Sequence, residues 1–360
     1  MKKFSVILSL VLALSLLSGC AGTPVVYYSD CTCPTGSHDL VGAVTEPAAE
    51  LPEGALKTGL YIAAGIGESK SAAADKNGEA KYDVTIVAVL VDDEGIIHDC
   101  IIDSVGASVQ FDASGAITSD LTAEILTKNE LGENYGMKKI SGIGAEWNEQ
   151  ATALASYAVG KTAEELRNGA IDETTGKAAE GSDLASSATI YLGGYVNAIE
   201  QAADNAKHLG AQSGDTLELA VISKAGSSAS ASEEKAGNAQ LDVDVTAITM
   251  NGETITSCYI DSVQAKVAFD QSGAITSEIS GAVSTKNQLG EQYGMKKISS
   301  IGAEWNEQAA SFASYVTGKT ADEVAGIAID EGTKTTDADL ATSVTIAIGG
   351  FQALIAKAAK

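Results

Sequence analysis

The stretch Ile143-Gly-Ala-Glu-Trp-Asn-Glu-Gln-Ala151 occurs a second time, unchanged, from Ile301 to Ala309. A period of 158 residues is too long for a solenoid unit, so each copy should belong to a full domain. Flanking stretches return with few changes at the same spacing: 111–119 as 269–277, 127–133 as 285–291, 135–141 as 293–299, and 160–163 as 318–321. The chain therefore contains two copies of one domain.

Each copy begins with patterns typical of β-strands. Val- and Ile-rich runs separated by turn residues predict hairpins at 83–91 with 96–105, and at 243–250 with 254–263, where Asn251-Gly252 is a strong turn signal. A third strand is expected to end at Phe111 and Phe269, before an Asp-x-Ser-Gly turn. Helical spacing follows at Ile143, Trp147, Ala151 and Leu154, at Ile301, Trp305, Ala309 and Phe312, at Leu192, Val196, Ile199 and Ala203, and at Ile348, Phe351, Ile355 and Ala359. We expect an α+β fold of two homologous domains, each a small antiparallel sheet packed with helices.

The first residues have the pattern of a bacterial export signal. Lys2 and Lys3 precede an apolar run that ends in Leu17-Ser-Gly-Cys20, which resembles a lipoprotein cleavage site with Cys20 as the lipidated residue. We expect a signal peptide at 1–19 and a flexible tether at 20–55, where no periodicity is visible. The two domains should then span 56–209 and 210–360. The expected location is the extracellular face of the cell membrane, held by a lipid anchor.

Charge and reactive residues exclude several classes of function. A net charge of −25 with no basic patch to offset it argues against nucleic-acid binding. The histidines His38, His98 and His208 are scattered, and no cysteine cluster has metal-ligand spacing, so we expect no metal site. Cys31 and Cys33 lie in the expected tether, whereas Cys100 and Cys258 occupy matching strand positions and should be buried apolar thiols.

A second repeated segment points to chemistry. Asp183-Leu-Ala-Ser-Ser-Ala-Thr189 and Asp339-Leu-Ala-Thr-Ser-Val-Thr345 each precede an Ile, a Gly-Gly pair and a helical tail. Together with the Leu-Gly, Trp and Gly-Lys elements of 128–163, this resembles the FMN-binding domain family of the flavin-carrying subunits of Rnf complexes and sodium-pumping quinone reductases. The layout is similar to tandem flavinylated lipoproteins of Gram-positive extracellular electron transfer. The resemblance covers roughly residues 55–360.

The resemblance implies covalent FMN on a Thr in Asp-x-x-Ser/Thr-Gly-Ala-Thr, attached through its phosphate by a flavin transferase. Residues that match this motif are Asp183, Ser186, Ala188 and Thr189, and Asp339, Thr342 and Thr345. Ser187 and Ser343 replace the motif's Gly, which matters if positive φ is needed there, and Val344 replaces its Ala. Ser114-Gly-Ala-Ile-Thr118 and Ser272-Gly-Ala-Ile-Thr276 look similar, but their Thr is one place too far and the sequence is typical of a turn.

Aromatic and sulfur side chains are candidates to line the flavin ring. Those that could line the flavin are Tyr135, Met137 and Trp147 in the first copy, and Tyr293, Met295 and Trp305 in the second. The two tryptophans are equally well explained as core residues of a helix. Lys128, Lys138 and Lys139 could contact the phosphate, although exposed lysines usually only solvate a face.

The resemblance implies an electron carrier rather than a substrate-specific enzyme. It would take electrons from a membrane quinone or NADH dehydrogenase or a quinol pool and pass them to extracellular acceptors. The alternative is a lipoprotein of the same fold that binds a solute or the cell wall without flavin. A nicotinamide-dependent reductase is disfavoured, because no Gly-x-Gly-x-x-Gly lies between a strand and a helix.

Overall fold

The structure, a computed structural model, describes residues 51–172 and 174–360. The expected signal peptide, Cys20, Cys31, Cys33 and His38 lie outside the described residues. The fold is α+β, with helices and two antiparallel sheets. The first repeat forms β1 (Lys57–Gly65), β2 (Gly78–Val91), β3 (Ile97–Phe111), α1 (Lys128–Leu131), α2 (Trp147–Ala158), α3 (Ala163–Ala170) and α4 (Gly193–Asp204). The second forms β4 (Thr216–Lys224), β5 (Gly237–Asn251), β6 (Thr254–Phe269), β7 (Ala282–Val283), α5 (Lys286–Leu289), α6 (Trp305–Val316), α7 (Ala321–Ala325) and α8 (Gly349–Ala358).

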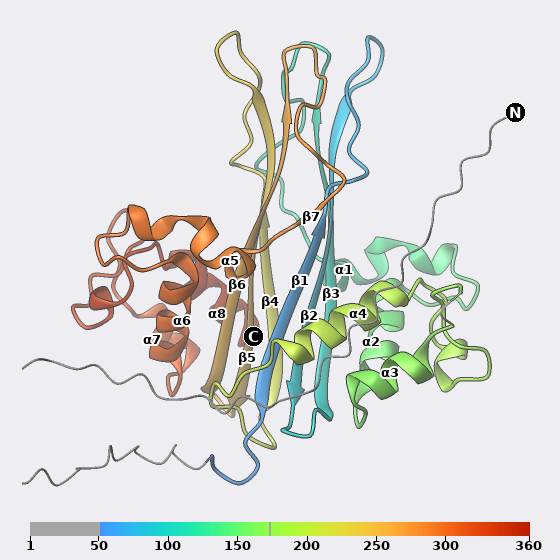
Figure 1. Ribbon diagram of the computed structural model, residues 1–360, viewed down its shortest axis with the longest axis vertical. Coiled ribbons are helices and arrows are strands. Elements are labelled where there is room, and N and C mark those ends of the chain that lie inside the picture. Colours follow the sequence, from blue (N-terminus) through green and yellow to red (C-terminus); the bar gives the residue numbers. More distant parts are fainter. Residues whose placement is uncertain (1–50, 173) are drawn as a thin grey trace, which may run out of the picture. The chain divides into compact units, whose positions relative to one another are not determined.

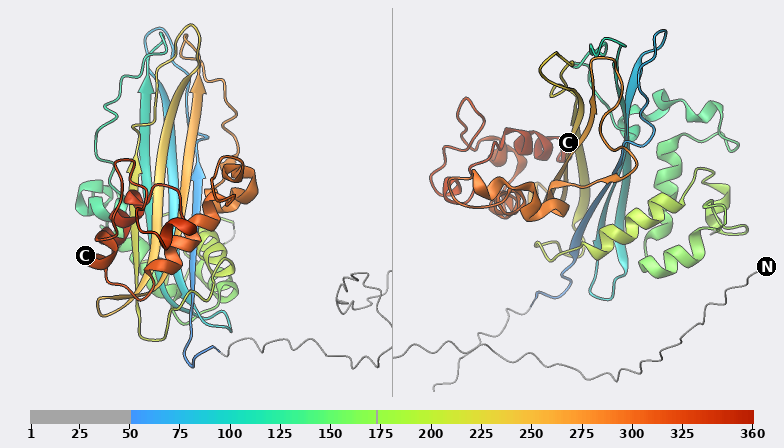
Figure 2. Two further views of the ribbon diagram at one scale, coloured as in Figure 1. Left: turned by 90° about the vertical axis from the view of Figure 1, so that its left-hand side faces the viewer. Right: turned by 45° about the horizontal axis from the view of Figure 1, so that its top comes forward.

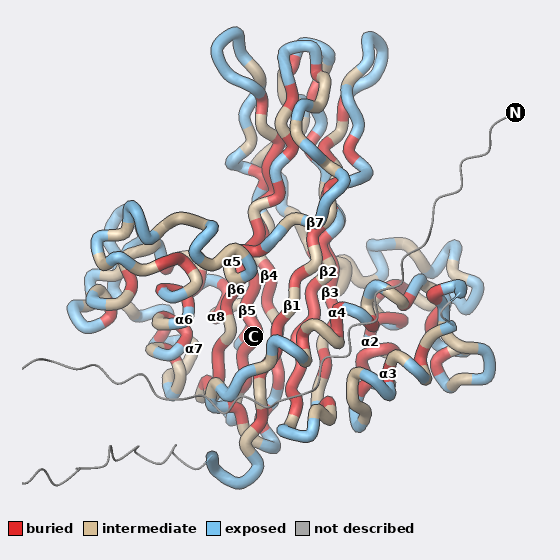
Figure 3. The backbone as a smooth tube through the Cα atoms, viewed as in Figure 1, coloured by how far each residue is buried: buried red, intermediate tan, exposed pale blue. Residues whose placement is uncertain are grey.

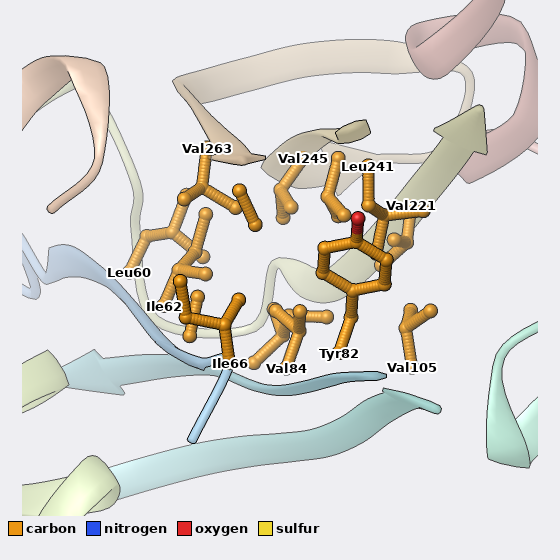
Figure 4. Packing of buried hydrophobic residues seen from close by; sticks show 14 of the residues in the cluster. Leu60, Ile62, Ile66, Tyr82, Val84, Val105, Val221, Leu241, Val245 and Val263 are labelled. Carbon is orange, nitrogen blue, oxygen red and sulfur yellow. The ribbon is translucent and has the colours of Figure 1, made fainter. Parts of the chain in front are cut away.

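The two sheets pack against each other in the middle of the described unit (Figure 1). One sheet has the order β3-β2-β1-β7 and the other β4-β5-β6. Their facing side chains form a single apolar core, which includes Leu60, Tyr82 and Val105 from one sheet and Leu241 and Val263 from the other (Figure 4). The two repeats, which we predicted as two domains, therefore share a core.

Helices cover the outer face of each sheet. Residues of α2, α3 and α4 form a second apolar cluster on the first sheet, and residues of α6, α7 and α8 form a third on the other (Figures 1 and 2). The run from Val84 to Val91 is apolar nearly throughout because both of its faces are covered, whereas the exposed residues gather on the hairpin tips and outer loops (Figure 3). Cys100 and Cys258 are buried in these outer clusters, as the sequence predicts, and burial raises the pKa of both thiols.

Each repeat also contributes backbone to the other. β7 pairs antiparallel with β1, and Ile125 forms the corresponding bridge with Ser223 of β4. At the hairpin tips, the N–H of Ile117 donates to Ser230 Oγ at 2.9 Å and the N–H of Ile275 donates to Ser71 Oγ at 3.0 Å. These contacts come in equivalent pairs, so the repeats are related by an approximate twofold arrangement within one compact unit, residues 51–360.

Several local predictions need correction. The strand expected at 96–105 and the third strand ending at Phe111 are one continuous strand, β3. In the second repeat the strand expected at 254–263 and the one ending at Phe269 are likewise one strand, β6. The first strands, β1 and β4, were not predicted. Ile143 was placed on a helix face, but α2 begins at Trp147 after its cap Glu146, and Ile143 lies in the preceding loop. The predicted Asp-x-Ser-Gly turns are present: Asp112 and Asp270 each accept hydrogen bonds from the N–H groups two and four residues later.

Candidate functional site

The stretch that is identical in both copies builds the start of α2 and of α6. In the second repeat Glu304 is buried, and its carboxylate accepts the N–H of Met295 at 2.8 Å. Glu307 accepts the N–H of Glu304 at 2.7 Å and so caps the helix. The turn that carries Met295 is thereby fixed to the helix that carries Trp305. The same bonds, from Glu146 and Glu149, hold the first repeat.

Gln308 links this helix to the Asp-to-Thr segment. It is fully buried, and its carboxamide oxygen accepts the N–H of Thr345 at 2.8 Å, the hydroxyl of Thr345 at 3.1 Å and the N–H of Ile346 at 3.2 Å. Its amide group donates to Ala303 O at 3.0 Å and to Ser299 Oγ at 3.3 Å. Gln150 makes the same set of bonds to Thr189 and Ile190. One buried glutamine in each repeat therefore sets the position of the candidate threonine.

The sequence analysis missed Gln150 and Gln308, although a signal existed. Both lie in the unchanged stretch, three residues after the tryptophan, on the apolar face of the helix. A long polar side chain on a buried face requires hydrogen-bond partners, since an unpaired buried amide costs about 1–3 kcal/mol.

A cavity of about 580 Å³ lies beside Thr345, and we call it the Thr345 cavity. The predicted residues Tyr293, Met295 and Trp305 line it together with Thr345. Its other lining residues are Asp244, Lys286, Ile298, Ser299, Ser300, Gln308, Lys334, Ile346, Ala347, Gly350 and Phe351. The structure thus gathers the second-copy aromatic and sulfur candidates around the candidate threonine. In the first copy Gln150, which bonds to Thr189, also donates to Met137 Sδ at 3.5 Å, and Trp147 is buried in the outer cluster.

Lys286 brings a positive charge to this aromatic wall. Its ammonium lies 4.6 Å from the ring centroid of Trp305 and 5.5 Å from that of Tyr293. Burial lowers the pKa of Lys286, while the carboxylates of Asp244, Asp242 and Asp261 act in the opposite direction. Lys128 occupies the same place over Trp147 and Tyr135, at 4.9 and 5.3 Å. Of the three lysines considered for the first copy, Lys138 instead pairs with Glu133 at 3.6 Å, and Lys139 is exposed.

The two sites differ at one position beside the threonine. Tyr191 in the first repeat occupies the position of Ala347, which lines the Thr345 cavity, and 63% of the Tyr191 surface is exposed. This ring lies over Gly176, where an added Cβ would be 2.0 Å from Tyr191 Cε2. The second repeat has Thr333 at the position of Gly176, and the Thr keeps the left-handed backbone, with φ 60°. In the first repeat the small Gly176 therefore accompanies the large Tyr191, and in the second repeat the larger Thr333 accompanies the small Ala347.

The serine that replaces the motif glycine adopts an ordinary backbone. Ser187 has φ −114° and Ser343 has φ −122°. Any residue adopts these values, so no strain arises from the missing glycine. Val344 and Ala188 are both buried in the outer cores, which accommodate the larger valine in the second repeat.

The remaining motif residues stay apart from the cavity. Asp183 begins a 3-10 turn that ends at Ser186, and the backbone oxygen of Asp183 accepts the Ser186 hydroxyl at 3.3 Å. Asp339 precedes the corresponding turn, Leu340–Thr342, and its backbone oxygen accepts the Thr342 hydroxyl at 2.7 Å. Neither Asp339 nor Thr342 lines the Thr345 cavity. These residues shape the turn that leads to the threonine.

No protein-family model, curated protein or solved structure matches this chain. None of the described helices has the length and apolar character needed to cross a membrane. Within residues 51–172 and 174–360, no group of His, Cys, Asp and Glu side chains is arranged to hold a metal ion.

Proposed function

We propose that this protein is a membrane-anchored extracellular electron carrier with FMN attached through its phosphate to Thr345 and to Thr189. The observation that supports this most is the Thr345 cavity. There, Thr345 lines the same hollow as Trp305, Tyr293, Phe351 and Met295. A volume of about 580 Å³ lies within the range of small-molecule sites, roughly 300–1,000 Å³.

The walls of the cavity fit a flat aromatic ring. Trp305 and Phe351 meet edge to face, with centroids 5.9 Å apart, and add aromatic carbon to a lining in which polar and apolar surface are about equal. Ile298 lines the cavity with 84% of its surface exposed, and its counterpart Ile140 is equally exposed. Two such isoleucines at equivalent positions are explained if a ring attached to each threonine covers them, since burying apolar surface contributes about 25 cal/mol per Å².

The surroundings of the threonine also suit a phosphate. Gly350 lines the cavity near the start of α8, where the first N–H groups of a helix lack partners within the helix. The helix dipole favours a negative charge at this end. Lys334 lines the same cavity and supplies a positive side chain, which the Asp244 carboxylate near Gly350 partly offsets. Gly193 and Gly194 begin α4 in the corresponding place after Thr189.

Bound flavin would supply the one- and two-electron chemistry that the side chains lack. The chain's residues would position and tune it. Gln308 holds Thr345 in place, the aromatic residues exclude water from the ring, and the Lys286 ammonium favours negative charge nearby. The proposed partners are a flavin transferase, a membrane quinone or NADH dehydrogenase or quinol pool as electron source, and an extracellular acceptor. Lipidated Cys20 would hold the protein at the membrane.

Intact mass spectrometry of protein co-expressed with a flavin transferase tests this proposal. We expect two added FMN groups, one after either Thr345→Ala or Thr189→Ala, and none in the double variant. Thr342→Ala is the matched control, since that hydroxyl lies in the same segment but outside the cavity; Thr276→Ala controls for the Ser-Gly-Ala turn. Unmodified wild-type protein would contradict the proposal and favour the alternative of a lipoprotein that binds without flavin.

A further inference from the structure

A second and larger hollow lies where the two repeats meet. It has a volume of about 780 Å³, and we call it the inter-repeat groove. Residues of β1 and β6 form its floor, α5 and α6 form one wall, and the connection that follows α4 forms the other. Tyr61 and Tyr259 bring aromatic surface to it, and Lys207 and His208 bring basic groups.

The groove is separate from the Thr345 cavity. Alternate residues of the same helices face the two hollows: Lys286 and Gln308 line the cavity, whereas Asn287 and Glu307 line the groove. Neither Thr345 nor Trp305 lines the groove. A site here therefore does not depend on flavin attachment.

The equivalent place on the other side of the molecule is bridged by a side chain. There Lys357 of α8 donates to Val221 O of β4 at 2.6 Å and forms an ion pair with Glu130. The counterparts of Val221 and Glu130 are Ile62 and Gln288, and both line the inter-repeat groove. Gln288 carries no charge, so it cannot attract a lysine as Glu130 does. Lys357 therefore spans the equivalent place on one side of the molecule, whereas the inter-repeat groove lies on the other side.

Lys207 is the basic group of the groove that is available to a ligand. The Lys207 ammonium lies 5.2 Å from the Tyr259 ring centroid and forms no ion pair with a carboxylate of the described residues. His208 is held at the groove by Asp93, at 3.0 Å. Asn306 also lines the groove, but its Oδ1 is buried and so is not accessible to a ligand.

We propose that the inter-repeat groove binds a small planar aromatic molecule that carries a carbonyl or anionic oxygen. The tyrosine rings offer faces for stacking, and the Lys207 ammonium offers a charge-assisted hydrogen bond to the oxygen. In a chain with net charge −25, an unpaired lysine in a groove selects for such an acceptor. The floor is mostly apolar, whereas about half of the lining residues are polar and include the carboxylates of Asp261 and Glu307, so Lys207 is the group that favours an acceptor oxygen.

Calorimetric titration of flavin-free protein with a water-soluble naphthoquinone sulfonate tests the proposal. We expect saturable binding of one molecule, weakened about tenfold by Lys207→Met and abolished by Ala310→Phe, which fills the groove from the exposed face of α6. Lys319→Met is the matched control, because Lys319 lies over Tyr315 at 4.5 Å outside the groove.

Absence of saturable binding to the wild-type protein would overturn the proposal. So would binding that neither Lys207→Met nor Ala310→Phe weakens, since the probe would then bind elsewhere. Thermal melts of the variants confirm folding, and Lys207→Met alone is decisive if Ala310→Phe does not fold. Because no flavin is present, failure of this test leaves the flavin proposal unaffected.

Discussion

The carboxamide oxygen of Gln308 accepts hydrogen bonds from both the amide and the hydroxyl of Thr345, at 2.8 and 3.1 Å. Gln308→Leu keeps the volume of the side chain but leaves three donors without their acceptor: the N–H groups of Thr345 and Ile346 and the hydroxyl of Thr345. Each lost bond costs about 1 kcal/mol, so we expect a loss of about 3 kcal/mol in the free energy of unfolding. Urea denaturation measures it, and hydrogen exchange should show faster exchange at the amides of residues 345 and 346.

Gln150→Leu provides the control within the same molecule. It should accelerate exchange at Thr189 and Ile190 and leave residues 345 and 346 protected, because each glutamine serves its own repeat. Unchanged protection at residue 345 in Gln308→Leu would show that other contacts hold the segment.

The sequence predicted the elements that have strong local patterns. The hairpin at Asn251-Gly252 and the helices that begin at Trp147 and Trp305 are present, because turn chemistry and apolar spacing act over a few residues. β1 was missed because its sequence contains Ala63, Ala64 and Gly65, which have low strand propensity; pairing with β2 and burial form it instead. The face-to-face packing of the two repeats was also missed. Apolar strand residues show that a face is buried but not which element covers it.

For the candidate site, too, the sequence shows local patterns but not the contacts between residues that are far apart in the chain. The threonines and aromatic residues could be taken from a motif, but the motif does not state which buried group holds them. Gln308 is 37 residues from Thr345 in the sequence, and only the packing of α6 against the segment brings them together. The ordinary φ of Ser343 is likewise a property of the turn that the sequence alone does not reveal.

Tyr191 and Gly176 form a pair that the second repeat replaces with Ala347 and Thr333. Gly176→Thr introduces a Cβ that overlaps the Tyr191 ring, so we expect a cost of about 1–3 kcal/mol from overpacking plus about 1 kcal/mol from its φ of 64°. Adding Tyr191→Ala should remove the overpacking and leave the backbone strain. A double-mutant cycle by urea denaturation measures the coupling, for which we expect the overpacking cost of about 1–3 kcal/mol.

Gly95→Thr is the control for backbone strain alone, since Gly95 has φ 81° and an added Cβ meets no atom within 4 Å. If the effects of Gly176→Thr and Tyr191→Ala on the free energy of unfolding are additive, the Tyr191 ring changes rotamer without cost and the overpacking prediction is wrong.

The rings of Phe111 and Phe269 stack at 4.0 Å with 3° between their planes, where the ends of β3 and β6 meet. Gly78 and Gly237 make room for these rings: an added Cβ would lie 2.4 Å from Phe111 Cε2 and 2.3 Å from Phe269 Cε2, respectively. Gly78→Ala should therefore destabilise the fold by about 1–3 kcal/mol. Gly106→Ala is the matched control in β3, where no atom lies within 4 Å, and it should be neutral or slightly stabilising. Equal thermal melts for the two variants would show that the ring moves without cost.

Asp261 predicts a pH dependence of stability. Burial raises its pKa to about 6, although Thr285 and the N–H groups of Asn287 and Ser262 favour the charged carboxylate. In the unfolded chain the pKa of Asp is about 3.9. Between about pH 4 and about pH 6 the folded protein therefore holds a proton that the unfolded chain has released. The contribution of Asp261 to stability is fully present below pH 4 and is lost as the pH rises, by about 3 kcal/mol in total.

Asp261→Asn isolates this effect, because asparagine keeps an acceptor for the N–H groups of Ser262 and Asn287 but does not titrate. Carboxylates with lowered pKa, such as Asp112 and Asp270, produce the opposite slope in both proteins and cancel in the comparison. The stability of the variant relative to the wild type should rise from about pH 4 to about pH 6 and then stay constant in urea titrations. Asp103→Asn should change in the same direction, since burial also raises the pKa of Asp103. Parallel curves of unfolding free energy against pH for wild type and Asp261→Asn would contradict this prediction. The folded carboxylate would then be ionised between about pH 4 and about pH 6, as in the unfolded chain, because its hydrogen bonds outweigh its burial.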